Sequence, residues 1–539
     1  MALYINPVYG LIPLMLIAAA FILPLFSFIT KKIKFFSLFT IVITFIVFIL
    51  STIIFLDVYR EGKPVLYPFG GWPPPIGIAY EIDLFNALFA FFVAFIALLI
   101  TIYDNWYSTT DTRIHYTFYV LLLGLLGGTF GCIYTGDIFN LFVMVEVLSL
   151  AAYALIAFYR SNRYSLEAAL KYTLLGAVAL SLYFVAAIVY YAAYGSLNMA
   201  DIAYMARSRS SLTPFSSIFG NIVAATAIAL ALTLWPFTFK SALFPNHFWL
   251  PDVYSSVSPV VAACFAGFTE ATAIYIIARY LYTIFGLDIV PELSQLRSVV
   301  LGALLVLGIL GALVGAFMMA IQRDARRLLA YSTVNHIGFT YIALSIGFFT
   351  KSPDILRIGL MAMLLHIINH SIGKVMLFLS IGTLMKSYNL NTSDLNTLTG
   401  LGRTTPIAGT AIVVGALHLI GLPPFSGFFS KYYIYQVYLS IGQPFIAWLV
   451  VLTTAISLMG YAKLLLITFG TKPGYGKVRE ALQSRTVLAI LMILTIAISI
   501  ALYTDFYNLL IKAAESLIDY RSYIDTFSSF VNTYLSMFR

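Results

Sequence analysis

Apolar runs of about 20 residues recur along the whole chain, separated by short polar segments. A helix of this length crosses the hydrocarbon core of a bilayer, because each residue adds about 1.5 Å. The pattern predicts about fourteen membrane-spanning helices, with ends accurate to a few residues. The predicted spans are 11–29, 35–56, 82–103, 116–135, 138–159, 170–194, 216–239, 257–284, 298–322, 327–349, 356–386, 404–422 continuing as 425–439, 445–469 and 486–511.

The composition agrees with this pattern, since 61% of the 539 residues are hydrophobic and only 10% are charged. No soluble globular class has such a composition. The predicted fold class is therefore an all-α polytopic membrane protein. The segment 513–538 alternates apolar and polar residues too finely to span a bilayer, and we expect it to form an amphipathic surface helix.

Charge and cysteine content exclude several functions. The net charge of +9 is ordinary for a membrane protein with basic loops, and nothing supports a nucleic-acid partner. Cys132 and Cys264 fall in apolar runs without a C-x-x-C motif or a Cys/His cluster, which argues against iron–sulfur, zinc and disulfide frameworks. No redox or nucleotide motif is present. We therefore expect no cofactor in this chain, and any redox chemistry would belong to another subunit.

Lysines and arginines are distributed unevenly between the predicted loops. One set of loops is richer in these residues than the opposite set and holds Lys31, Lys32, Lys34, Arg113, Arg160, Arg163, Lys171, Arg323, Arg326, Arg327, Lys386, Arg403, Lys472, Lys477, Arg479 and Arg485. Cytoplasmic loops carry the excess of positive charge, so this distribution predicts a cell-membrane protein with both termini outside. The opposite loops hold Arg60, Lys63, Arg207, Arg209, Arg279, Arg297, Lys351 and Arg357.

Two lysines lie beside prolines that should interrupt a spanning helix. Lys240 lies between Pro236 and Pro245, and Lys431 follows the pair Pro423 and Pro424. A broken helix at membrane depth is tolerated only where its backbone is buried in protein or lines a wet cavity. Interrupted helices at matching places in two halves are typical of internal repeats around an ion or substrate site.

Glu146 lies near the middle of the predicted span 138–159, among apolar residues. A charge at this depth costs about 2.5 kcal/mol or more, so it is rarely kept without a function. We expect Lys240 to be its partner, because a buried lysine can exchange its proton. The alternatives are a purely structural ion pair and, for Lys240, a side chain that reaches the membrane interface.

His366, His370 and Lys374 are spaced at i, i+4 and i+8, so they share one face of a helix over about 12 Å. Histidine can accept and donate a proton near neutral pH, which favours a proton relay. A metal or haem site is the alternative, but no Cys, Asp or Glu lies nearby in the sequence. A polar stripe that serves only helix packing is the second alternative.

Three further ionisable residues extend this polar axis. His336 lies in a predicted span, and Lys431 would be the last member of the path. An interfacial lysine in a re-entrant segment is the alternative for Lys431. Glu270 lies inside the span 257–284, where it is either a proton carrier or a counter-ion to Lys240 or Lys374.

These motifs resemble the antiporter-like membrane subunit family shared by Mrp-type cation/proton antiporters, respiratory complex I and membrane-bound hydrogenase-type complexes. The resemblance is strongest to the D-type members of Mrp antiporters and covers roughly residues 80–470. Its most specific motif is Lys240-Ser-Ala-x-x-Pro-x-His-x-Trp-Leu-Pro-Asp252. The segments Asn369-His-x-x-x-Lys374 and Gly421-Leu-Pro-Pro-Phe-x-Gly-Phe-Phe-Ser-Lys431 support it.

The resemblance implies two inverted five-helix repeats with discontinuous helices seven and twelve. On this basis the expected units are residues 1–115 for helices one to three, 116–284 for the first repeat, 298–470 for the second, and 486–539 for helix fourteen with the amphipathic tail.

The resemblance also implies roles for individual residues. Glu146 resembles the helix-five glutamate, and Lys240 resembles its helix-seven lysine partner. His370 and Lys374 resemble the helix-eleven relay, His336 lies near the helix-ten motif, and Lys431 resembles the helix-twelve lysine. The chain departs from the family at Glu270, where many relatives carry a lysine or histidine.

The expected function is that of a proton-translocating or cation/proton antiport subunit in a larger complex, coupled to redox chemistry or cation exchange in other subunits. Expected partners are other membrane subunits, protons or Na⁺, and lipids. The first alternative is a structural subunit whose proton path is interrupted at Glu270. A standalone transporter of a small organic solute is the second, although the sequence shows no pocket chemistry for one. The host complex stays open.

Overall fold

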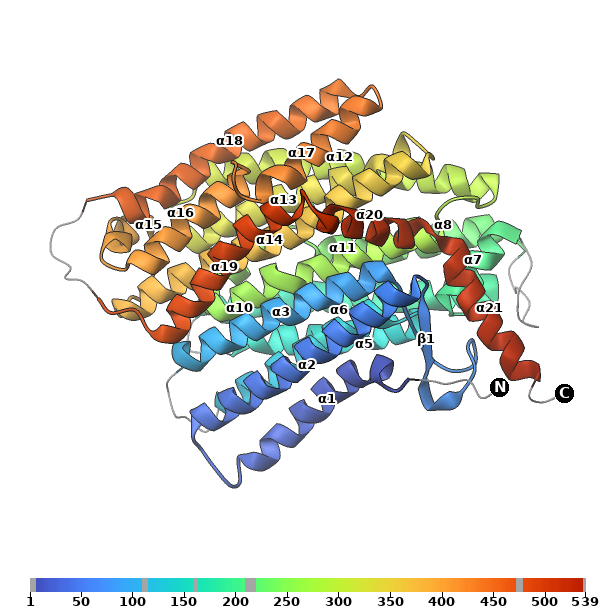
Figure 1. Cartoon of the computed structure of the whole chain (residues 1–539), viewed down its shortest axis with the longest axis horizontal. Helices are drawn as coiled ribbons and strands as arrows, with labels where there is room; N and C mark the ends of the chain where they lie inside the picture. The colour runs from blue at the N-terminus through green and yellow to red at the C-terminus, as the bar shows by residue number, and fades with distance from the viewer. Residues whose placement is uncertain (1–5, 109–114, 159–162, 209–219, 472–477, 537–539) are drawn as a thin grey trace.

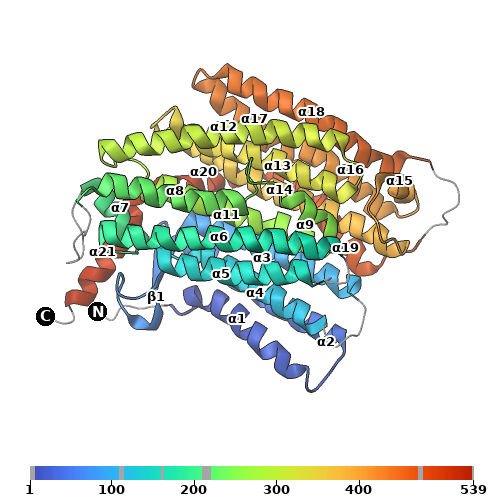
Figure 2. The same cartoon turned by 180° about the vertical axis from the view of Figure 1, so that it is seen from behind.

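The computed structural model describes residues 6–108, 115–158, 163–208, 220–471 and 478–536, and most of these are helical. Long helices lie side by side in one bundle, with α1 and α2 along one edge and α12 and α18 along the opposite edge (Figures 1 and 2). Among the described residues, 12 helices are long and apolar enough to cross a membrane, or up to 13 if a bent pair counts as one span. The predicted all-α polytopic class is confirmed.

The first part of the chain forms the lower edge of the bundle and its centre in Figure 1. Its elements are α1 (Val8–Phe26), α2 (Ile33–Glu61), β1 (Val65–Pro68), η1 (Phe69–Gly71), β2 (Ala79–Ile82), α3 (Leu84–Tyr107), α4 (His115–Tyr134), α5 (Ile138–Ala157) and α6 (Arg163–Tyr194). β1 and β2 pair antiparallel, with Val65 opposite Ile82. The spans had not predicted this hairpin, because its apolar residues continue into the apolar run of α3.

The middle of the chain contains the most buried candidate span among the described residues. Its elements are α7 (Met199–Ser208), α8 (Ile222–Lys240), α9 (Leu250–Ser256), α10 (Pro259–Cys264), the π-helical η2 (Phe265–Thr269), α11 (Glu270–Ala278) and the π-helical η3 (Arg279–Ile284). Pro259–Ile284 forms one candidate span whose most apolar stretch is wholly buried. Such a helix lies inside a protein rather than against lipid.

The second half of the chain packs over the other side of this buried centre. Its elements are α12 (Pro291–Ile321), α13 (Ala325–Leu344), η4 (Ser345–Phe348), α14 (Pro353–Ser387), α15 (Leu395–Leu398), η5 (Leu401–Arg403), α16 (Pro406–Ile420), α17 (Gly427–Ser440), α18 (Pro444–Phe469), α19 (Leu482–Ala501), α20 (Asp505–Ile518) and α21 (Tyr520–Ser536). Only 28% of the apolar stretch of α2 is buried, as expected where a helix faces lipid.

Short polar residues fix where several helices begin. Asp83 caps α3 by accepting a hydrogen bond from the Asn86 backbone, and the Asn86 side chain accepts one from the Asp83 backbone. Asp137 and Asp324 cap α5 and α13 by accepting a hydrogen bond from the backbone N–H groups of Asn140 and Arg327. These caps satisfy N–H groups that a helix start leaves unpaired.

About fourteen spans were expected, and the described residues hold 12 to 13 candidates by length and composition. The predicted span 327–349 matches α13, which is buried and 20 residues long but too polar to count as a candidate membrane span by itself. The predicted span 404–439 is divided between α16, with 15 residues, and α17, with 14. The pairing of helices into inverted repeats, and the domain boundaries drawn from it, stay predictions.

The end of the chain differs from the prediction in one respect. The span 486–511 was expected to be continuous, but α19 ends at Ala501, and a turn separates it from α20. The polar residues of Tyr503-Thr-Asp505 explain the break, since Asp505 begins a new helix. The tail is helical as expected up to residue 536, and α21 lies at the same end of the bundle as the hairpin (Figure 1).

Two of the arginines that were assigned to loops are buried. Arg279 is 3% exposed and Arg297 is 4% exposed, and both lie inside helical segments. Arg279 falls inside the predicted span 257–284 and Arg297 directly precedes the predicted span 298–322, so counting both as loop residues was wrong. Some positions in the orientation argument, the spans and the tail lie outside the described residues: Arg113, Arg160, Arg209, Lys472, Lys477, residue 159, residues 216–219 and residues 537–538.

Candidate ion-translocation path

Lys240 is the last residue of α8, and its ammonium group is buried against α5. Lys240 Nζ donates a 2.6 Å hydrogen bond to Ser149 Oγ, while the rings of Tyr153 and Tyr172 lie 5.8 Å and 5.9 Å from Nζ. Both rings can stabilise a cation by their negative faces. The structure therefore gives Lys240 a polar partner and an aromatic surround.

The predicted ion pair between Glu146 and Lys240 is not formed at contact distance. No salt bridge within 4.0 Å joins these two described residues, although their charges still interact. Glu146 lies three residues before Ser149 on α5 and is partly exposed on the outer surface of this chain. The expectation assumed that Glu146 faced the interior, but that position on the helix belongs to Ser149.

The first helix break begins directly after Lys240. Pro236 lies inside α8, which continues for a full turn beyond it, so the predicted interruption at Pro236 is wrong. Pro245 lies in the non-helical segment between α8 and α9. Trp249 Nε1 donates to the Phe239 carbonyl oxygen across 2.9 Å, which satisfies one of the acceptors that the break leaves free.

Glu270 and Lys374 lie in the buried centre, on α11 and α14. Tyr254 donates a hydrogen bond to Glu270 Oε1, whereas Glu270 Oε2 has no partner within the described structure. Lys374 Nζ donates to the Leu329 carbonyl oxygen across 2.7 Å. Their charges interact, yet the two side chains form no salt bridge within 4.0 Å. The geometry therefore favours Lys374 over Lys240 as the lysine to which Glu270 could serve as counter-ion.

Hydrogen bonds join His336 and His366 into a chain that crosses four helices. His336 Nδ1 lies 3.1 Å from His366 Nε2, and His366 Nδ1 lies 3.0 Å from Ser430 Oγ. At the other end, His336 Nε2 lies 2.9 Å from Tyr461 Oη, which lies 2.5 Å from Ser332 Oγ. Each of these groups can both accept and donate a proton, so the chain can reverse its hydrogen-bond direction.

His370 lies beside this chain without closing it. Its ring centroid is 5.5 Å from that of His336, and its Nε2 atom has no hydrogen-bond partner among the described residues. His370 and Lys374 share a face of α14, as their spacing predicted, and both are buried. His370 thus lies between the Glu270 and Lys374 side chains and the His336–His366 chain.

Lys431 lies near the start of α17, just after the second helix break, which separates α16 from α17. Its Nζ atom donates 3.0 Å hydrogen bonds to the carbonyl oxygens of Leu419 and Ile420, the last residues of α16. A helix C-terminus carries partial negative charge, so it suits a cation. Pro423 and Pro424 lie in the gap between the helices, as predicted. Lys431 is 7% exposed, and this burial argues against the interfacial alternative.

A second set of hydrogen bonds closes the same break. Ser426 Oγ donates to Asn369 Oδ1 across 2.7 Å, and Asn369 Nδ2 donates to the Ser426 carbonyl oxygen across 2.9 Å. His418 Nε2 lies 2.9 Å from the Asn369 carbonyl oxygen. These contacts hold the two half-helices against α14, so His418 has a structural role at the break.

Several residues of the path carried no recognisable sequence signal. Ser149, Tyr254, Ser430 and Tyr461 contact the predicted residues directly, yet serine and tyrosine are common throughout the chain. The only available hint was that Ser430 precedes Lys431 in the second break motif. Among the described residues, no hydrogen bond joins the surroundings of Lys240, the Glu270 and Lys374 side chains, and the His336–His366 chain to one another. Proton movement between these three clusters would therefore need bridging water.

A metal site finds no support in the part of the chain that the structure describes. No group of three or more His, Cys, Asp or Glu residues lies close enough to hold a metal ion there. His336 and His366 instead contact each other and hydroxyl groups, which suits proton transfer.

Comparison with known proteins identifies the family of this chain. Residues 135–457 match the family model described as NADH:quinone oxidoreductase/Mrp antiporter, TM. The chain belongs to this family. It is 37% identical over 399 residues to NADH-quinone oxidoreductase subunit N of Desulforudis audaxviator, covering 74% of this chain and 73% of the relative. It is 31% identical over 385 residues to the D component of the Na(+)/H(+) antiporter of Alkalihalophilus pseudofirmus, covering 71% of each chain.

Solved structures extend the family likeness to nearly the whole chain. A chain of the membrane-bound sulfane sulfur reductase, an archaeal respiratory membrane complex, superposes with a TM-score of 0.86 at 28% identity, covering 97% of this chain and 100% of that one. A chain of the Mrp complex from Dietzia superposes with a TM-score of 0.80, over 97% of this chain and 100% of that one. At 22% identity this match shows the fold alone. The resemblance read from the motifs is confirmed, and the structural neighbours are subunits of multi-subunit membrane complexes.

Proposed function

We propose that this chain is the proton-translocating or cation/proton antiport subunit of a larger membrane complex. The observation that carries the proposal is the hydrogen-bonded chain through His336 and His366, which lies between two buried lysines at helix breaks. Protons would enter near Glu146 and Lys240, pass Glu270 and Lys374, and leave by Lys431.

The side chains favour protons over Na⁺ as the moving ion. Sodium prefers several oxygen ligands at once, whereas the described path offers nitrogen groups from lysine and histidine over most of its length. Only Glu146 and Glu270 supply carboxylates, and they belong to separate helices, α5 and α11. Exchange of Na⁺ would then occur in another subunit of the complex.

The partners and orientation follow from the family and the charge pattern. Relatives of this chain are subunits named for quinone oxidoreduction or Na⁺/H⁺ antiport, so the driving force would come from redox chemistry or a cation gradient elsewhere in the complex. We propose that the chain carries no cofactor of its own, contacts lipids through α1 and α2, and holds both termini outside the cell membrane.

A structural subunit is the second candidate, and one observation favours it. Glu270 and Lys374 each make hydrogen bonds, to Tyr254 and Leu329, that do not continue toward the histidine chain. If water does not bridge these gaps, the path stops at Glu270, as the alternative reading of the sequence expected. Transport measurements distinguish the two candidates.

The test is ion translocation by the assembled complex in sealed vesicles. Lys240→Ala should abolish translocation, and Glu146→Gln should reduce it, while both variants still assemble. Lys351→Ala is the matched control, because this exposed lysine bonds only to Ser294 at the surface. Full translocation by assembled Lys240→Ala would contradict the proposal and favour the structural subunit.

A further inference from the structure

A second buried charge cluster lies at the hairpin end of the bundle, apart from the central path. Asp83 Oδ2 and Arg279 Nη1 form a 2.5 Å salt bridge, and both side chains are almost fully buried. Glu81, two residues before Asp83, is 1% exposed. The cluster joins β2, the start of α3 and η3, and none of its members was among the predicted site residues.

Glu81 differs from Asp83 in having no hydrogen-bond partner. Neither Oε1 nor Oε2 of Glu81 is bonded within the described structure. Asp83, by contrast, accepts from the Asn86 backbone at Oδ1 and from Arg279 at Oδ2. Since a buried carboxylate without partners is strongly disfavoured, Asp83 holds the negative charge that Arg279 neutralises, and Glu81 is left over.

The surroundings of Glu81 contain too little positive charge for two carboxylates. The charged and titratable groups that face it are Arg279, Asp83 and Tyr523. Tyr523 comes from α21, and its hydroxyl and Glu81 Oε2 both lie 3.4 Å from the position that a Cβ on Gly136 would take. Burial is the main reason why the pKa of Glu81 lies well above its ordinary value.

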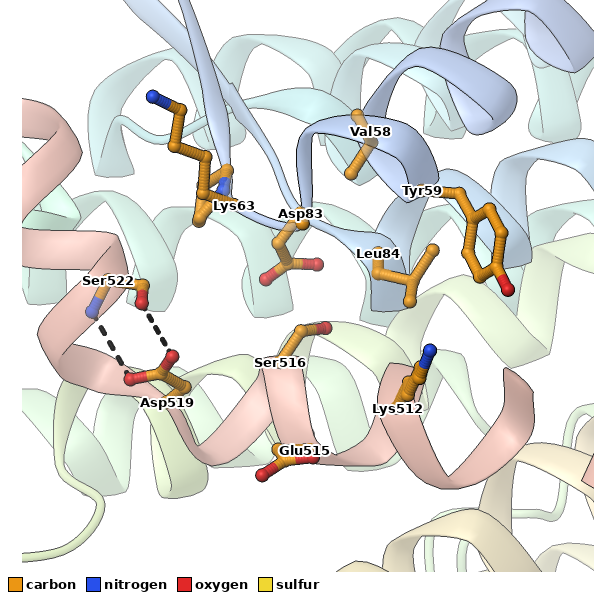
Figure 3. Close-up of a pocket in the computed structure, with 12 residues that line it drawn as sticks. Val58, Tyr59, Lys63, Asp83, Leu84, Lys512, Glu515, Ser516, Asp519 and Ser522 are labelled. Atoms are coloured by element: carbon orange, nitrogen blue, oxygen red, sulfur yellow. Dashed lines mark hydrogen bonds between the residues drawn. The ribbon is translucent and has the colours of Figure 1, made fainter. Parts of the chain in front are cut away.

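A cavity that opens at the surface reaches one member of this cluster, Asp83. It has a volume of ≈ 280 Å³, and Asp83 lies at its inner wall while exposed Lys63, Lys512 and Glu515 line it toward solvent. Figure 3 shows the Asp83 carboxylate pointing into the space between α3 and Ser516 of α20. A volume of this size holds several water molecules, since one needs about 10–15 Å³ by this measure.

We propose that Glu81 is a second proton-binding site of the chain, loaded from this cavity by way of Asp83. In the loaded state Glu81 is a neutral carboxylic acid, and Asp83 pairs with Arg279. On unloading, the proton passes from Glu81 by way of Asp83 to water in the cavity, and Arg279 is then shared between two carboxylates. The three groups change from a net charge of zero to one negative charge.

The site does not use any residue of the central path. The hydrogen bonds and salt bridge of Asp83 and Arg279 reach Asn86, Tyr275 and Thr283, and none of them reaches Glu270. Proton binding at Glu81 is therefore independent of proton movement past Lys240, and each can be tested without the other. It predicts a protonated carboxyl group at neutral pH in a place where the solution can exchange its proton.

Infrared spectroscopy of the complete complex in lipid nanodiscs tests this directly. The unaltered complex should show a carboxylic-acid C=O band at neutral pH that shifts on transfer to D₂O and disappears at higher pH. Glu81→Gln should remove this band and no other. Glu61→Gln is the matched control, since Glu61 is a glutamate exposed at the end of α2.

Further variants keep the test decisive. Lys240→Ala should leave the band in place, which separates this site from the central path. If Glu81→Gln fails to assemble, Glu81→Asp should keep an acid band at a changed frequency. A band that survives Glu81→Gln, or a spectrum without any acid band at neutral pH, would overturn the proposal, because Glu81 would then be ionised. A band whose pH dependence follows Na⁺ concentration would overturn it as well.

Discussion

Lys240 Nζ donates a 2.6 Å hydrogen bond to Ser149 Oγ, one turn along α5 from Glu146. Ser149 in turn donates to the Val145 carbonyl oxygen of its own helix. The lysine is thus held by a neutral partner, and the carboxylate beside it is free to interact with whatever covers α5. This arrangement makes Ser149 the residue that positions the cation of the first cluster.

Ser149→Ala should slow ion translocation without preventing assembly. A hydrogen bond to a charged group contributes about 1.5–3 kcal/mol, so its loss from a step that needs charged Lys240 corresponds to roughly a tenfold to hundredfold lower rate. The measurement is the initial rate of proton uptake by vesicles that contain the complex. Ser181→Ala on α6 serves as control, because Ser181 is exposed and bonds only within its helix. Equal rates in both variants would remove Ser149 from the path.

Tyr461→Phe tests the histidine chain with a minimal change of shape. It removes the hydroxyl that lies between His336 Nε2 and Ser332 Oγ while the ring stays in place. A neutral hydrogen bond is worth about 0.5–1.5 kcal/mol, so we expect a rate about threefold to tenfold lower.

Tyr438→Phe is the control for this substitution, because Tyr438 is equally buried but donates to the Ile342 carbonyl oxygen, away from the histidines. Both variants should assemble to the same level. If they translocate protons at the same rate, the hydroxyl of Tyr461 has no part in transport.

Gly427→Ala should disrupt the second helix break. A Cβ at Gly427 would lie 1.9 Å from the His418 carbonyl oxygen, which is backbone and cannot move aside. Overpacking of this kind costs about 1–3 kcal/mol, so the thermal midpoint and the yield of assembled complex should both fall. Gly124→Ala is the matched control, with its new Cβ at 3.6 Å from Ala151 Cβ, an ordinary contact. A fully stable Gly427→Ala complex would show that α16 and α17 are free to separate.

Much of the architecture could be predicted because long hydrophobic runs indicate helices that span the membrane. The two breaks beside Lys240 and Lys431 were readable for the same reason, since proline next to a charge is rare inside an apolar run. The exact start of the first break was not predicted, because α8 includes Pro236 and continues to Lys240. Periodicity also placed His370 and Lys374 on one buried face.

The partners of the path residues could not be predicted, because they depend on helices that are far apart in sequence. Tyr461 reaches His336 from 125 residues away, and no local pattern distinguishes it from the many other tyrosines. The pairing of Glu146 with Lys240 failed for a related reason, since the orientation of α5 decides whether Glu146 or Ser149 faces the lysine. Arg279 was taken for a loop residue because its partner, Asp83, lies 196 residues earlier.

The contact between α21 and the hairpin should weaken as the pH rises. Burial raises the pKa of Glu81 while α21 lies against the hairpin. Release of α21 would expose Glu81 and return its pKa to about 4.3. Above this pH, docking of α21 on the hairpin therefore takes up a proton at Glu81. The free energy of releasing α21 falls by up to about 1.4 kcal/mol per pH unit until the raised pKa is reached.

Amide hydrogen exchange of α21 measures this opening. At each pH, exchange in the unaltered complex is compared with that in Glu81→Gln, so that the intrinsic effect of pH on exchange cancels. Glu81→Gln stays neutral and should lose the extra dependence, so the ratio of the two rates should rise by up to about tenfold per pH unit. Glu61→Gln should behave like the unaltered complex. A ratio that stays constant from acid to alkaline pH would mean that Glu81 keeps the same protonation whether α21 is docked or released.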